Sequence, residues 1–494
     1  MSIHILLIRP RMKYLLLLIV ALSITFIFAP NKASAATINV SPGCTLDNAI
    51  LSMNSASNQG GCTASGTYGS NDTISLSAGT FNYANTNVIT VPLTVQGAGM
   101  GQTIIDAQGN NGGLSFNNPN ITPQQATVQD VTIKNPNSIL INDYGAINTF
   151  NYSMTIRRVE VYADVAQSVD SSMIEVSAWM NGISSTIEDI YIHDIIFESS
   201  AIFITSNGAT TSGNIVRRTT ITNVEGTKND SVLLVCFYSR AGGHTSGLAE
   251  NITITDVTAT NGYSISYISA IADSLSGGDG EVNVTARNIT IIGNPQVGVT
   301  GSGILSASLA TPGASAASSI DFQNILGVNL DVFNAEFEPN AGGTESATSA
   351  SLGGNITDAT ATSELNHPTD QAEIVGLSSS LGPLQDNGGT IQTIALLENS
   401  AAIDAGVTNS LTTDQRGIAR PQGSGYDSGA YEYIPPIPDP IDPPVSNTTH
   451  GQLADTGDNI KLYLSLTYVL FLLGLVGIGL KIWLCHIKPN NNGF

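Results

Sequence analysis

The sequence is poor in charged residues, and in basic ones most of all. Only 11% of its 494 residues are charged, which is less than half the share in an ordinary globular protein. Asp and Glu number 39 against 17 Lys and Arg, and the formal charge is -22. Such a chain lacks the basic surface that nucleic acid or an anionic membrane requires, so a nucleic-acid partner is excluded. The partners it favours are neutral glycans, cations or proteins.

Cysteine and tryptophan are also scarce. Four Cys are too few for a disulfide-dense scaffold or a zinc-ribbon protein. The chain has 2 Trp, whereas a stack of immunoglobulin-like sandwiches tends to bury a Trp in each domain. Glycine, by contrast, is abundant at 49 residues. The length allows two to four ordinary domains or one elongated repeat array.

The N-terminus predicts export. Basic residues between Arg9 and Lys13 precede an apolar run over 14–29, and Ala33-Ser34-Ala35 supplies a small-residue cleavage site. Residues 1–35 are therefore predicted to be a signal peptide, and an uncut membrane anchor is the alternative. Translation could start at Met1 or at Met12, because the signal is complete without the first eleven residues.

The C-terminus predicts an anchor. A Pro-rich spacer over 434–452 favours extended chain, and an apolar segment over 462–480 is long enough to form a transmembrane helix. Lys481 and Lys488 place the tail over 481–494 in the cytoplasm and the bulk of the chain outside the cell. Before the helix, residues 453–457 read Leu-Ala-Asp-Thr-Gly.

This order of spacer, motif, helix and basic tail resembles the cell-wall sorting signal of sortase substrates. The resemblance rests on Leu453, Thr456 and Gly457, and the sequence departs from the family in having Ala454 where Pro is usual. It implies a bacterial surface protein with a sortase as partner and a covalent link to the cell wall. A plain membrane anchor through the helix is the alternative.

Between the two ends, one short pattern recurs: an apolar residue, two polar ones, then alternating apolar and polar residues. Six copies occur, at 128–133, 156–161, 187–192, 216–221, 254–259 and 286–291. Short strands that repeat every thirty-odd residues predict an all-β fold, a parallel β-helix over 126–380. Asp130, Arg158, Asp189 and Arg218, at the third position of their copies, should form a ladder along one sheet, with Asp256 as a later member.

The segment over 36–125 is expected to cap and start the β-helix. Leu46, Ala49, Ile50 and Met53 form one helical stripe behind Thr45 as N-cap, and a helix there would cover the first coil. The strand, Gly-rich turn and second strand over 89–106 resemble the opening coils of bacterial right-handed β-helix surface proteins of the pectate-lyase-like fold.

Two of the four cysteines are expected to pair. Cys44 and Cys62 flank the predicted helix in the exported region, where a disulfide can form and persist, and two buried thiols are the alternative. Cys236 lies in an apolar run and is predicted to be a core residue, and Cys485 lies at the cytoplasmic membrane edge.

Residues 381–433 contain four short motifs in order, at 382–389, 400–406, 413–421 and 427–432. Together these motifs resemble the choice-of-anchor Q domain, a family found at the C-terminal end of secreted bacterial β-helix proteins. Asp414 and Asp427 are expected to pair with Arg416 and Arg420 as a structural ion-pair cluster. A catalytic use of this cluster is disfavoured because no nucleophile accompanies it.

No residue constellation points to catalysis, so we predict no catalytic, cofactor-binding or metal-binding residues. Acids and bases share one column of the repeat, which favours mutual ion pairing. His193 and His244 are interpreted as turn or surface residues, and Gly277–Glu281 is the one candidate Ca²⁺ loop. The favoured function is non-catalytic adhesion, with a glycan or protein ligand on another surface. An extracellular polysaccharide lyase or glycoside hydrolase and a passive wall-coat or stalk protein are the alternatives.

Overall fold

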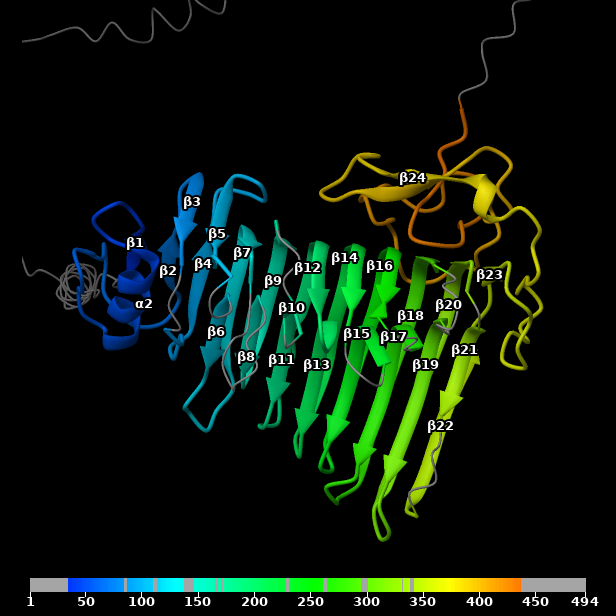
Figure 1. Cartoon of the computed structure of the whole chain (residues 1–494), viewed down its shortest axis with the longest axis horizontal. Helices are drawn as coiled ribbons and strands as arrows, with labels where there is room; N and C mark the ends of the chain where they lie inside the picture. The colour runs from blue at the N-terminus through cyan, green and yellow to red at the C-terminus, as the bar shows by residue number, and fades with distance from the viewer. Residues whose placement is uncertain are drawn as a thin grey trace, which may run out of the picture. The chain divides into compact units, whose positions relative to one another are not determined.

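The strands of this protein are short, apolar on alternate residues and stacked in parallel. The computed structural model describes residues 34–436 apart from 84–86, 110–112, 137–145, 165–167, 170–171, 228–230, 261–263, 295–300, 331 and 338–341. All the elements below belong to one compact unit that ends at Pro435. The prediction of a parallel β-coil is confirmed (Figure 1).

The larger sheet has 15 strands, and every pairing in it is parallel. Along its main path lie β1 (Thr37–Asn39), β2 (Asp72–Ser75), β4 (Leu93–Gln96), β7 (Gln124–Lys134), β9 (Tyr152–Tyr162), β12 (Thr186–Phe197), β14 (Thr210–Gly226), β16 (His244–Ala259), β18 (Gly280–Ile292), β20 (Ser315–Val328) and β22 (Thr344–Ser351). Beside this path lie β3 (Gly79–Asn82), β5 (Thr103–Asp106), β10 (Ser168–Val169) and β23 (Ile356–Thr357).

The second sheet has 8 strands and supplies the opposite wall of the coils. It contains β6 (Leu114–Asn117), β8 (Ile147–Phe150), β11 (Ile174–Ala178), β13 (Ser200–Asn207), β15 (Ser231–Arg240), β17 (Ser264–Ser274), β19 (Gly301–Ala310) and β21 (Val332–Phe337). A continuous apolar core of Ile, Val, Leu and Ala side chains fills the space between the sheets. Each coil buries its core residues against the next coil, so stability accumulates along the stack.

The long strands of the larger sheet bend at residues that the sequence pattern treated as ordinary strand positions. Asp130, Arg158, Asp189 and Arg218 are neighbours in the register, as expected, but their φ angles are 60, 51, 57 and 47°. This left-handed conformation turns the chain, and Asp and Asn adopt it more readily than Arg. The ladder is therefore a column of bends.

The fifth copy of the repeat was assigned five residues too late. The register pairs Arg217 with Glu250 and Thr219 with Ile252, which places Asn251 in the column of Arg218. Asp256 instead belongs to a second column of left-handed bends, with Asp194 and Asn223. Most bends follow a polar residue and precede an apolar one, as in Glu188-Asp189-Ile190 and His193-Asp194-Ile195, so the same short pattern occurs twice in several coils and sequence alone cannot tell the two copies apart.

One helix covers the start of the stack (Figure 1). The predicted N-cap and helix are confirmed: α2 (Leu46–Ser55) begins after Thr45, whose side chain accepts a hydrogen bond from the Asn48 N–H. Its buried stripe includes Leu46, Ala49, Ile50 and Met53. Cys44 and Cys62 form a disulfide that ties the residue before this helix to the loop after it.

After the last coil the chain turns back. A short 3-10 helix (Ser378–Ser380) leads into an antiparallel pair, β24 (Leu381–Gln385) and β25 (Thr393–Leu396). In Figure 1 this region lies over one flank of the coils from β14 to β20. We call residues 381–433 the C-terminal segment.

Five predicted features lie wholly or mostly outside the described residues: the signal peptide, the Pro-rich spacer over 434–452, the motif of Leu453, Thr456 and Gly457, the helix over 462–480 and the tail that contains Cys485. Among the described residues, no helix combines the length and apolar character needed to cross a membrane.

Candidate functional site

The two columns of bends delimit a narrow outward face, which we call the short face. Its first column, in register order, is Thr132, Glu160, Tyr191, Thr220, Thr253, Thr290 and Leu326. Its second column includes Lys134, Tyr162, His193, Thr222 and Thr255. Both columns point outward because the alternate residues, such as Ile190 and Ile192, are buried in the core.

The C-terminal segment covers the later part of the short face. Gln415 is 2% exposed; its amide donates to the Thr219 carbonyl and to Thr220 Oγ1, both at 2.9 Å, and its oxygen accepts from Thr253 Oγ1 at 2.5 Å. Further along, the Ala430 N–H donates to Thr290 Oγ1. The covered part of the first column thus consists of Thr and Leu, whose hydroxyl and apolar groups can contact the C-terminal segment.

The earlier part of the short face, which this segment only borders, is chemically different. The same columns here contain Lys134, Glu160, Tyr162, Tyr191 and His193. The imidazole of His193 lies between two phenol rings, stacked on Tyr191 at a centroid distance of 4.2 Å and on Tyr162 at 5.2 Å.

Two carboxylates hold the His193 ring at both nitrogens. Nε2 lies 3.2 Å from Glu160 Oε1, and Nδ1 lies 2.7 Å from Asp194 Oδ2. Burial lowers the pKa of His193, but the two carboxylates outweigh it, so the net shift of this pKa is upward. An imidazolium donates from both nitrogens, which matches this geometry.

Glu160 is held as a carboxylate by the same contacts. Its Oε2 accepts a hydrogen bond from Thr132 Oγ1 at 2.6 Å. The hydrogen bond with His193 lowers the pKa of Glu160 and, with Thr132, prevails over the opposing effect of burial. Glu160 is therefore charged at neutral pH and is a hydrogen-bond acceptor, not an acid.

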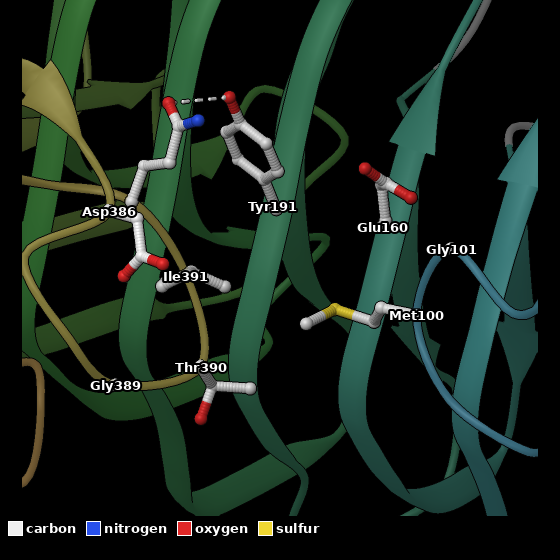
Figure 2. Close-up of a pocket in the computed structure, with 9 residues that line it drawn as sticks. Met100, Gly101, Glu160, Tyr191, Asp386, Gly389, Thr390 and Ile391 are labelled. Carbon is white, nitrogen blue, oxygen red and sulfur yellow. Dashed lines mark hydrogen bonds between the residues drawn. The ribbon is translucent and has the colours of Figure 1, made fainter.

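A cleft of about 290 Å³ opens beside this group (Figure 2). Met100 and Gly101 form one wall, Glu160 and Tyr191 lie on the solenoid, and the β24–β25 loop over 386–392 forms the other wall. The Gly101 N–H bonds Thr132 Oγ1 at 2.8 Å, and the Tyr191 hydroxyl bonds Gln392 Oε1 at 3.2 Å, so both walls are tied to the short face.

A glycine allows the second wall to lie close to the rest of the C-terminal segment. Gly389 has φ 95°, and a Cβ there would lie 2.8 Å from Arg416 Cα. Only glycine meets both the left-handed conformation and this close approach. The Gly388-Gly389 pair of the anchor-domain resemblance thus shapes the cleft as well as the turn.

The predicted cluster in the C-terminal segment is present with one change of partner. Arg416 pairs with Asp414 at 2.6 Å, whereas Arg420 pairs with Glu432 at 2.8 Å and reaches only the backbone carbonyl of Asp427. The Asp427 carboxylate instead accepts the N–H groups of Asp404 and Tyr433, and burial raises its pKa to about 7. Spacing alone could not choose among three nearby carboxylates.

The basic pairs of the repeat are neutralised by neighbouring coils. Arg158 pairs with Asp130 at 2.5 Å, Arg218 with Asp189 at 2.7 Å, and Arg217 with Glu188 at 2.7 Å. This is the mutual ion pairing that the mixed column predicted.

The other candidate residues lie away from the cleft. His244 pairs with Glu281 at 3.1 Å, and Asp279 of the candidate Ca²⁺ loop accepts a hydrogen bond from Ser315. Across the ranges that the structure describes, no three His, Cys, Asp or Glu side chains are placed to hold a metal ion. Cys236 is buried and forms no disulfide with a described residue.

Sequence reasoning missed the cleft. His193 was interpreted as a turn or surface residue, yet its ring lies between two tyrosines and two carboxylates. A signal was present at the fifth position of the aligned repeats, where Glu160 and Tyr191 replace the Thr of other coils. The wall over 386–392 gave no such signal, because it lies about 200 residues further along the chain.

Comparison with known proteins gives only distant structural matches. No protein-family model and no curated protein matches the chain. Among solved structures, it is similar to the A-module of the Azotobacter vinelandii mannuronan C-5 epimerase AlgE6, with 11% identity over 57% of this chain and 91% of that one, at a TM-score of 0.22.

The chain is also similar to a GH87 α-1,3-glucanase catalytic domain in complex with tetrasaccharides, with 12% identity over 65% and 69% of the two chains, at a TM-score of 0.23. The GH87 α-1,3-glucanase of Streptomyces thermodiastaticus gives 13% identity over 57% and 63%, at 0.23. At these identities and TM-scores the matches carry no argument about what this chain binds.

Proposed function

We propose that this protein is an exported, surface-held solenoid that binds a glycan in the short-face cleft. The observation that carries the proposal is the change along the short face, from Thr and Leu under the C-terminal segment to Glu160, Tyr191 and His193 beside the cleft. Carboxylate oxygens accept hydrogen bonds from sugar hydroxyls, and aromatic rings supply apolar contact with a polar edge. A concave site with a few converging polar groups is the usual form of a ligand site.

The proposal includes how the protein is held at the surface. We propose that the coils are right-handed, that the C-terminal segment is a choice-of-anchor Q-like region, and that residues 453–480 attach the chain to the cell wall or the membrane. Residues 434–452 then act as a spacer that keeps the cleft away from the cell surface.

A library of neutral, amine-bearing and acidic oligosaccharides, presented to the full-length chain on cells that express it, tests the proposed binding. We expect at least one class to bind, and we expect Tyr191→Ala to weaken that binding about 10-fold. Tyr191→Phe keeps the ring and should retain most of the affinity. Trp179→Ala removes a 59% exposed aromatic side chain that does not line the cleft, and should have no effect.

Binding that survives Tyr191→Ala would contradict the proposed site. Absence of binding throughout the library would favour a protein ligand or the passive stalk.

Polysaccharide cleavage is the second candidate, and one observation favours it. Glu160 and Asp386 both line the cleft, and Figure 2 shows them on opposite sides of it. Glycosidases use two carboxylates that flank the scissile bond. Release of shorter oligosaccharides that stops in Glu160→Gln, while binding persists, would favour this candidate over a binding protein.

A further inference from the structure

The carboxylates around the cleft outnumber the cations that neutralise them. On the solenoid, Glu160 and Asp194 share the single imidazole of His193. Lys134 is the other short-face cation in the described part of these coils, and it already pairs with Asp164.

Asp386, on the opposite wall, adds an uncompensated charge. Its Oδ1 accepts the N–H of Gly388 at 2.9 Å, which shapes the turn. Asp386 forms no salt bridge with a described residue, whereas Glu160 and Asp194 both contact His193. The cleft therefore has a negative carboxylate on each side, Glu160 and Asp386.

The charge decides which glycans the cleft can accept. A uronate would bring its own carboxylate between Glu160 and Asp386, where like charges repel. A neutral sugar would gain hydrogen bonds only. An ammonium group on a sugar could donate to these carboxylates with the added strength of a charged hydrogen bond.

The size of the cleft limits the contact to a short stretch of the glycan. At about 290 Å³ it is close to the lower end of the range of ligand sites, about 300–1,000 Å³. Tyr191, whose hydroxyl is held by Gln392, supplies the apolar surface beside the charges.

We infer that the cleft selects glycans with protonated amino groups, such as glucosamine polymers, over N-acetylated and acidic ones. This inference rests on the proposed function and narrows its ligand class.

The test compares three oligosaccharides of equal length with the purified full-length chain: hexamers of glucosamine, N-acetylglucosamine and galacturonic acid. Calorimetry at low salt should rank them in that order, with a preference of about 10-fold for the amine over the N-acetyl hexamer. Because part of the attraction is screened, the preference should fall roughly threefold at 0.5 M salt.

Asp386→Asn isolates the charge, because the amide oxygen can still accept the Gly388 N–H. We expect this variant to lose most of the preference for the amine and to bind the N-acetyl hexamer within about twofold of the parent. Glu160→Gln should reduce the preference in the same direction. The matched control is Asp321→Asn, which removes an exposed carboxylate from a separate hollow of the long strands and should change nothing.

The outcomes separate the inference from the proposed function. If the N-acetyl or the acidic hexamer binds as tightly as the amine, and Tyr191→Ala abolishes that binding, the cleft binds glycans but the inference is wrong. If Asp386→Asn and Asp321→Asn lower amine binding equally, the attraction is non-specific and the inference is wrong. If no hexamer binds, the inference is wrong, and the oligosaccharide library decides separately whether the cleft binds any other glycan.

Discussion

Gln415 should control whether the C-terminal segment stays docked on the coils. Its side chain makes three hydrogen bonds, to the Thr219 carbonyl and to the hydroxyls of Thr220 and Thr253, and it is 2% exposed. Gln415→Ala removes all three and leaves the partners buried. At about 1 kcal/mol for each lost hydrogen bond, the docked state should be destabilised by about 3 kcal/mol.

That loss has a local signature. A destabilisation of the docked state by about 3 kcal/mol raises the equilibrium constant for its opening on the order of 100-fold, since each 1.4 kcal/mol is a factor of ten. Hydrogen exchange of the full-length chain should therefore accelerate in peptides from residues 381–433 and stay unchanged in peptides from β7 to β12. Glycan binding should weaken as well, because the same segment supplies one wall of the cleft.

Gln422→Ala is the matched control for this experiment. Gln422 is exposed and its amide donates only to the nearby Ala419 carbonyl, so its loss should change exchange by less than about twofold. Equal acceleration in the coils and in the C-terminal segment would show that Gln415 stabilises the whole fold and does not act as a local clamp. No acceleration at all would refute the assignment of these hydrogen bonds.

Three further predictions address pH, the N-terminal cap and the anchor. The folded-state pKa of His193 is raised, so the stability that its contacts contribute should be complete below about pH 6.5 and should be lost as pH rises through the folded-state pKa. His193→Gln should therefore flatten the decline in the free energy of unfolding above about pH 6.5. An unchanged decline in this variant would exclude His193 as its source. Replacing both Cys44 and Cys62 by Ser should lower the free energy of unfolding by about 3 kcal/mol through the loop-entropy effect, measured by denaturant titration without reductant. The unfolded, oxidised parent should then show free thiols only at Cys236 and Cys485, and free thiols at Cys44 and Cys62 would contradict the pairing. Thr456→Ala should leave an uncut precursor that detergent extracts from membranes, whereas the parent protein should be released only when the cell wall is digested. If detergent also extracts the parent protein with residues 458–494 still attached, the anchor is the helix and the sorting motif is not cut.

Part of this site was within reach of sequence reasoning. Each coil repeats the same outward positions, so aligning Thr132, Glu160, Tyr191 and Thr220 reveals a local change from Thr to Glu and Tyr. The alignment itself was harder, because several coils contain two bends with the same short pattern and Asp256 was placed in the wrong column. Apolar alternation with a period of two identifies strands, but it does not determine which residues pair between neighbouring coils.

The sequence alone determined the parallel coil and its N-terminal helix cap, since both follow from local periodicity: alternation in the strands, and Leu46, Ala49, Ile50 and Met53 on one helical face. Only the tertiary structure decided that the C-terminal segment folds back on the short face, that Arg420 pairs with Glu432, and that Asp386 lies opposite Glu160. The physical reason is the range of the interactions. Periodicity reports on neighbours within one strand or helix, whereas the cleft is closed by a few hydrogen bonds between residues about 200 positions apart, such as those of Gln392 and Gln415. No local pattern records which distant polar side chains will meet.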